Sequence, residues 1–179
     1  GKSIKLTDDQ RATLRRWLWR SFFSRRFSAG VLRNLKRDIE EVVKLREGKR
    51  STLADIAVNL TDDFFTARKF SIAAADSKTF VLLLVNAAPL SFVSGSPAAL
   101  APVLSSVSVL ANFAMISAAD NKTLGGVAPS VYKARMPAAK IDEILEHAIC
   151  PTNLFEDDFS TFVQLRATKL TAAAKALMM

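Results

Sequence analysis

The sequence predicts a mainly α-helical protein, and three observations support that prediction. Half of the 179 residues are hydrophobic, so the chain can bury a core of its own. Apolar residues recur at helical spacing in several segments. No alternation of apolar and polar residues is long enough to indicate a sheet, except for a possible short hairpin near residues 85–110.

The first two helices are expected within the first fifty residues. Thr7 and Gln10 have the spacing of a capping box, which predicts a helix over residues 8–23. Apolar residues then recur at helical spacing in a second segment, for which Ser28 is the expected N-cap. This helix should end before Gly48, because glycine readily adopts the backbone conformation that terminates a helix.

The rest of the chain is expected to form shorter helices separated by turns. Residues 79–119 carry no charge, but the apolar run at 80–85 is too short to cross a membrane. Residues 98–119 are interrupted by Pro102 and Asn112, so we expect a buried helix pair with a loop there. The other expected elements are a helix start at 61–63, a short helix at 129–132, a helix at 140–148 and a final amphipathic helix from about residue 157.

Positive charge is concentrated at the N-terminal end of the chain. Residues 1–50 hold 15 Lys or Arg against 6 Asp or Glu, a net charge of +9, whereas residues 51–179 hold 10 against 11, a net charge of −1. A basic segment joined to a near-neutral body favours an anionic partner, either nucleic acid or an anionic membrane surface.

The segment from residue 15 to residue 28 interleaves arginines with aromatic residues. Arginines can bind phosphates and aromatic rings can stack on bases, so the segment is the candidate nucleic-acid site. Its candidate binding residues are Arg15, Arg16, Arg20, Arg25 and Arg26. The alternative is an amphipathic helix whose aromatics are core and whose arginines are solvated. Trp17 shares a face with other apolar residues and is expected to be buried, which leaves Trp19 to face outward.

Other chemical signals in the sequence are few. It contains no glycine-rich phosphate loop and no nucleophile elbow. His147 is the single histidine, and we expect it to cap a helix or lie on the surface. Cys150 is the single cysteine, which excludes a disulfide framework and fits a small buried residue. With no signal peptide visible, we expect a reducing, cytoplasmic location, and the start at Gly1 suggests a fragment or processed chain.

Several segments, taken in order, resemble the GmrSD-type restriction proteins of bacteria. Residues 17–28 resemble the family's "WFW…RYS" segment, and residues 128–132 are similar to its "PSxY" element. Residues 110–122 resemble the segment that holds the second and third positions of its HNH nuclease site. The closing helices of the family are similar to residues 144–151, 157–159 and 166–167 of this chain.

The resemblance implies a helical domain with a degenerate or incomplete HNH-like module. Family members join a ParB-like domain to a helical region and an HNH-type nuclease, and this chain lacks the ParB-like domain. It also lacks the paired histidines, which should fall between about residues 104 and 110, where Ser105 and the residues after it look like a join left by a lost loop. One such histidine acts as general base and the other helps hold a divalent metal. Asn112 carries over as the residue that orients the base, and Asn121 as the third position near the metal.

These observations give the following expectations. A basic helical segment should cover residues 1–76, and a degenerate HNH-like and C-terminal helical segment should cover residues 77–179, unless both form one compact domain. The expected function is that of a fragment or remnant of a modification-dependent restriction endonuclease, which binds DNA but does not cleave it. No cofactor is expected in this chain, whereas an intact member would need a divalent metal. The alternative is a helical protein-interaction module of a phage-defence system, which docks on a ParB-like domain or another subunit. Membrane attachment is the least favoured reading.

Overall fold

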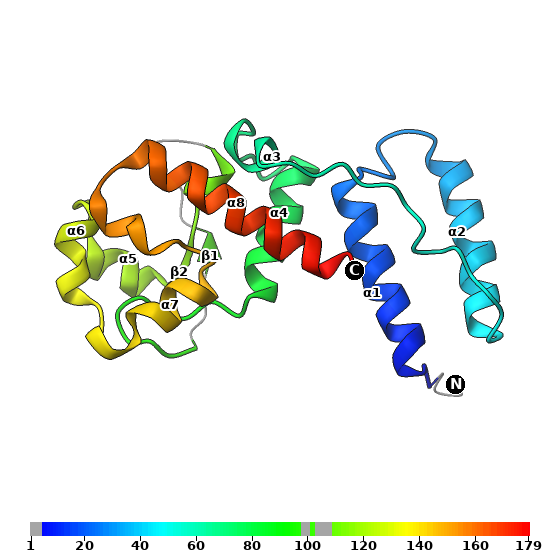
Figure 1. Cartoon of the computed structure of the whole chain (residues 1–179), viewed down its shortest axis with the longest axis horizontal. Coiled ribbons are helices and arrows are strands. Elements are labelled where there is room, and N and C mark those ends of the chain that lie inside the picture. Colours follow the sequence, from blue (N-terminus) through cyan, green and yellow to red (C-terminus); the bar gives the residue numbers. More distant parts are fainter. Residues whose placement is uncertain (1–4, 98–100, 103–108) are drawn as a thin grey trace. The chain divides into compact units, whose positions relative to one another are not determined.

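The computed structural model of the protein describes residues 5–97, 101–102 and 109–179, and it is mainly helical, as predicted (Figure 1). The chain divides into two compact units, which are described separately below. Unit 1 consists of Gly1–Leu60 and Ala174–Met179, and unit 2 of Thr61–Ala173. The suspected join at Ser105 and most of the expected histidine segment lie outside the described residues.

Unit 1 is built on two antiparallel helices, α1 (Asp8–Phe23) and α2 (Val31–Arg46), which lie side by side (Figure 1). The capping box of Thr7 and Gln10 is present at the start of α1, as predicted. The N-cap of α2 is Gly30 rather than Ser28, and it has a φ of 62°. Glycine adopts this left-handed conformation at little cost, so the chain turns into α2 without a side-chain cap.

The prediction for the two tryptophans was wrong. Trp19 is buried and contacts the rings of Phe22 and Phe23, whereas Trp17 is only partly buried. Trp17 faces α2, where its Nε1 donates a hydrogen bond to Asp38. The spacing of residues along one helix does not reveal a polar partner on a neighbouring helix. It therefore could not show that the Trp17 indole faces α2.

Unit 2 is a set of short helices with one long C-terminal helix. Its helices are α3 (Asp63–Thr66), α4 (Ala75–Asn86), α5 (Ala118–Leu124), α6 (Pro129–Tyr132), α7 (Ile141–His147) and α8 (Phe159–Leu177), the last of which ends among the residues of unit 1. Short 3₁₀ helices cover Leu110–Asn112, Lys133–Arg135, Ala138–Lys140 and Thr152–Glu156. The predicted helices near residues 63, 129, 141 and 159 are therefore confirmed.

The core of unit 2 includes the residues that follow Leu60. Phe65 is fully buried and packs edge-on against Phe80 of α4. Phe70 stacks on Phe113, with ring centroids 4.5 Å apart. These aromatic contacts join the segment after Leu60 to the later helices, so the residues from Thr61 onward fold with them.

The expected helix pair over residues 98–119 is not formed in the part of this segment that the structure describes. Strand β1 (Ala101–Pro102) pairs antiparallel with β2 (Met115–Ile116), and α5 begins only at Ala118. Proline lacks a backbone N–H and opposes helix continuation, so Pro102 fits a short edge strand. No helix among the described residues is long and apolar enough to cross a membrane.

Candidate functional site

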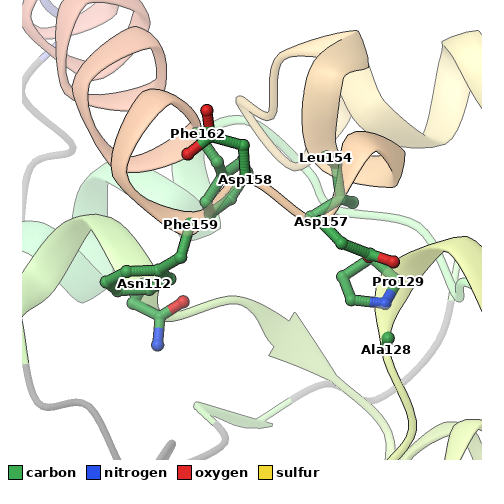
Figure 2. Close-up of a pocket in the computed structure, with 8 residues that line it drawn as sticks. All are labelled: Asn112, Ala128, Pro129, Leu154, Asp157, Asp158, Phe159 and Phe162. Carbon is green, nitrogen blue, oxygen red and sulfur yellow. The ribbon is translucent and has the colours of Figure 1, made fainter.

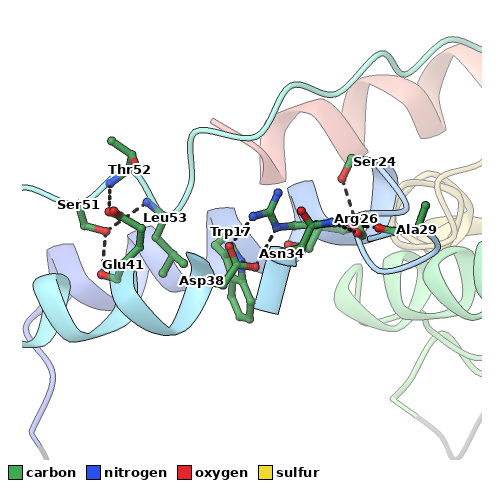
Figure 3. Close-up of polar contacts among 11 residues, drawn as sticks. Trp17, Ser24, Arg26, Ala29, Asn34, Asp38, Glu41, Ser51, Thr52 and Leu53 are labelled. Carbon is green, nitrogen blue, oxygen red and sulfur yellow. Dashed lines mark hydrogen bonds and ion pairs between the residues drawn. The ribbon is translucent and has the colours of Figure 1, made fainter. Parts of the chain in front are cut away.

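Two of the five candidate arginines make structural contacts within unit 1. Arg20 donates from Nε to the carbonyl of Met178 at 2.8 Å and from a terminal nitrogen to that of Ala54 at 3.1 Å. Arg26 is largely buried and forms a two-pronged ion pair with Asp38, at 2.6 and 2.8 Å (Figure 3). Arg20 ties α1 to the segments packed around it, and Arg26 ties the turn after α1 to α2.

The other three candidate arginines reach solvent. Arg15 and Arg25 are exposed, and Arg16 is partly exposed. Arg15 and Arg16 are neighbours on α1, whereas Arg25 lies in the turn after it, with a φ of 53°. Arg15 and Arg16 therefore lie on α1 and reach solvent, and nucleic-acid binding by them stays a prediction.

Helix α2 turns two carboxylates inward, although charged residues normally face solvent. Asp38 accepts hydrogen bonds from Arg26 and Trp17 (Figure 3). Glu41 accepts from the Lys44 ammonium and from the backbone N–H of Thr52, both at 2.6 Å. Lys44, followed by Thr52, lowers the pKa of Glu41 from 4.5 to about 2. Sequence patterning missed this arrangement because both acids look like surface residues.

Replacing Glu41 with glutamine should make the free energy of unfolding less dependent on pH in the acidic range. A carboxylate whose pKa is lowered by folding stabilises the folded state above its unfolded pKa, and this contribution is lost as the pH falls through the folded pKa. Glu41→Gln should therefore be less stable than the unaltered chain at pH 7, and the difference should shrink between pH 4.5 and about 2. Urea unfolding across this range measures it. Glu40→Gln, at an exposed position, is the control, and an equal pH dependence of both variants would contradict the assignment.

The two asparagines assigned to the HNH site lie on either side of β2 in unit 2. Asn112 ends the 3₁₀ helix before β2 and lines a pocket of about 220 Å³ (Figure 2). Asn121 is exposed on α5, after β2, and does not line this pocket. The structure therefore places one of the two candidates in a cavity and the other on the surface.

The pocket beside Asn112 contains two carboxylates, and each accepts a hydrogen bond at the start of a helix. Asp157 accepts from the backbone N–H of Ser130 at 3.1 Å, near the start of α6. Asp158 precedes α8 and accepts from the hydroxyl of Thr161 at 2.6 Å and its backbone N–H at 3.1 Å, which lowers the pKa of Asp158. No group of three His, Cys, Asp or Glu side chains that could hold a metal occurs among the described residues.

A buried arginine that sequence reasoning missed supports the backbone next to Asn112. Arg166 on α8 is 1% exposed. Its three nitrogens donate to the carbonyls of Ala111, Ala148 and Ile149, at 2.9 to 3.3 Å. Its position four residues after Phe162 and four before Leu170 places it on the apolar face of α8, which was the available signal.

The expectations for the single histidine and cysteine are confirmed. His147 Nδ1 lies 2.9 Å from the carbonyl oxygens of both Ala87 and Ala88, so the imidazole caps the end of α4. Since both partners are acceptors, Nδ1 carries the proton. Cys150 is buried, and this burial raises the pKa of its thiol, as expected for an unreactive core residue.

Comparison with known proteins adds no relative to this description. No family model matches the chain, and neither the curated proteins nor the solved structures include a significant match. The likeness to GmrSD-type proteins therefore depends on the quoted segments alone.

Proposed function

We propose that this chain is a nucleic-acid-binding part of a GmrSD-type restriction protein and that it holds nucleic acid without cutting it. The observation that carries the proposal is the surface charge of unit 1. Residues 1–50 have a net charge of +9, and two of their carboxylates, Asp38 and Glu41, are buried and bonded inside the unit. The exposed surface of α1 and α2 therefore presents many cations and few acids to a polyanion.

Binding of this kind would depend on phosphates rather than on base sequence. Each Lys or Arg that neutralises a phosphate releases condensed counterions, which makes affinity fall steeply with salt. Arg15 and Arg16 are the best-placed of the predicted residues, because Arg20 and Arg26 also bind within the protein. Contacts of this type position a protein on a duplex with little discrimination between sequences.

The absence of cleavage follows from the residues at the HNH-like positions. The sequence offers no histidine between residues 104 and 110, so no imidazole there can accept a proton from water or hold a metal. In the pocket beside Asn112, the carboxylates of Asp157 and Asp158 accept hydrogen bonds at helix starts. The function proposed for this chain includes no metal-dependent step.

Removing two arginines of α1 should weaken DNA binding and its salt dependence. Arg15→Ala/Arg16→Ala should flatten the slope of log K against log salt by about 2, because two phosphate contacts are lost. A gel-shift titration of a short duplex at several salt concentrations measures both quantities, and the duplex should remain intact when magnesium or manganese is added.

The matched control is Lys78→Ala/Lys122→Ala, which removes the same charge from two exposed positions of unit 2. It should leave affinity and slope nearly unchanged. Equal binding by the unaltered chain and the Arg15/Arg16 variant would refute the proposed interface. Metal-dependent cleavage that disappears in Asn121→Ala would refute the proposed lack of activity.

A further inference from the structure

Helix α2 exposes its apolar side, and the residues that do so form a continuous surface. The α2 apolar face consists of Val31, Leu32, Leu35, Ile39, Val42 and Val43, all exposed. Leu32 is 83% exposed and Ile39 56%, whereas Asp38 on the same helix is 3% exposed. An amphipathic helix normally buries its apolar side, so this surface lacks a partner within the part of the unit that the structure describes.

The spacing of these residues fits one kind of partner, another α-helix. Leu32, Leu35, Ile39, Val42 and Arg46 follow one another at intervals of three and four residues, the seam along which two helices pack. Helix α1 extends the surface, because Leu14 lines a groove of about 260 Å³ together with Val42 and Leu45. A groove of this kind receives the side chains of a helix laid along it.

Positive charge lies around the groove, whereas the far edge of the α2 apolar face carries charges of both signs, Lys36 together with Glu40 and Glu47. Arg46 lines the groove. Lys36 is exposed and lies four residues after Leu32 and three before Ile39, which makes it their neighbour on the helix surface. On α1, Arg11 is exposed and lies three residues before Leu14, which makes it a neighbour of the groove. A partner with carboxylates beside its apolar seam would complement these cations, whereas a second copy would bring like charges together.

We propose that the α2 apolar face binds an amphipathic helix of another protein that carries carboxylates beside its apolar seam. This interaction goes beyond nucleic-acid binding and does not depend on it. A lipid surface fits less well, because helices that lie in a membrane interface commonly insert aromatic residues, and α2 has none. The partner is therefore an acidic helix, in the mode by which grooves select helical ligands.

The probe is a designed helical peptide of about three heptads, with leucine at the seam positions and glutamate beside them. A second peptide carries lysine in place of every glutamate. Like charges keep either peptide from pairing with itself. Fluorescence anisotropy of the labelled peptides with the full chain should show that the glutamate peptide binds at least about tenfold more tightly than the lysine peptide.

The variant Leu35→Ser/Ile39→Ser should weaken binding of the glutamate peptide by about tenfold or more, since large apolar residues dominate such interfaces. Both positions are exposed, so the variant should fold, and its thermal unfolding checks this. Its matched control is Arg37→Ser/Asp55→Ser, which changes one exposed residue on the opposite side of α2 and one outside α2 without altering net charge and should bind normally.

Three results would overturn the proposal. The first is equal binding of the two peptides, or peptide binding unaffected by Leu35→Ser/Ile39→Ser. The second is a dimer of the unaltered chain in sedimentation equilibrium that this variant abolishes, which would make a second copy the occupant. The third is cosedimentation with phosphatidylserine vesicles, lost in the variant, without peptide binding. The DNA gel shift of the same variant should match that of the unaltered chain, which separates this proposal from the nucleic-acid function.

Discussion

Replacing Arg166 with methionine should lower the free energy of unfolding by about 3–5 kcal/mol, because three buried carbonyls lose their hydrogen-bond donor. Methionine fills similar space but donates no hydrogen bond. The carbonyls of Ala111, Ala148 and Ile149 would then lose their guanidinium donor inside the protein. An unsatisfied buried polar group costs about 1–3 kcal/mol, and water can reach few of these sites because Arg166 is 1% exposed.

Urea unfolding followed by circular dichroism measures this loss, and two further variants separate its causes. Arg166→Ala should be less stable than Arg166→Met because it also leaves a cavity. Gln164→Met is the control, since it changes an exposed residue of the same helix and should shift stability by less than about 0.5 kcal/mol. A loss below about 1 kcal/mol in Arg166→Met would mean that the carbonyls find other donors.

The effect should reach the pocket beside Asn112, because Arg166 binds the carbonyl of the preceding residue. Hydrogen exchange should therefore speed up around Asn112 in Arg166→Met before the chain unfolds globally. Faster exchange there would show that the guanidinium holds the backbone beside Asn112 in place.

The sequence predicted the elements whose signals are local. The capping box at Thr7 depends on four consecutive residues, and Pro129 favours the first turn of α6 through its fixed φ, so both could be read without knowing the fold. The helix pair expected over residues 98–119 failed because hydrophobicity without periodicity does not distinguish a helix from a short strand pair such as β1 and β2.

The parts that could not be predicted depend on partners distant in sequence. Trp19 rather than Trp17 is buried because Asp38, on another helix, binds the Trp17 indole. The acceptors of Arg166 could not be predicted because they come from separate segments of unit 2. Helix α2 has clear amphipathic periodicity, but periodicity does not say which side faces the protein.

Replacing Asp38 with alanine should destabilise the protein by about 3–4 kcal/mol, because it leaves a buried charge without its partner. The Arg26 guanidinium is largely buried beside Asp38 and donates to both of its carboxylate oxygens. The Trp17 Nε1 would lose its acceptor as well. Trp17 and Trp19, the two tryptophans of the chain, both lie on α1, so urea unfolding followed by tryptophan fluorescence reports on this unit.

The Asp38 prediction also has an internal test, because removing both charges should cost less than removing one. A buried ion pair can often be replaced by apolar side chains of similar volume at little cost, whereas an unpaired buried charge cannot. Arg26→Met/Asp38→Leu should therefore recover most of the stability that Asp38→Ala loses, and Glu40→Ala, an exposed neighbour on α2, should change it by less than about 0.5 kcal/mol. If the double variant were less stable than Asp38→Ala, the ion pair itself would hold the turn after α1 against α2. Recovery would instead show that the two helices pack equally well whether the buried charge is paired or removed.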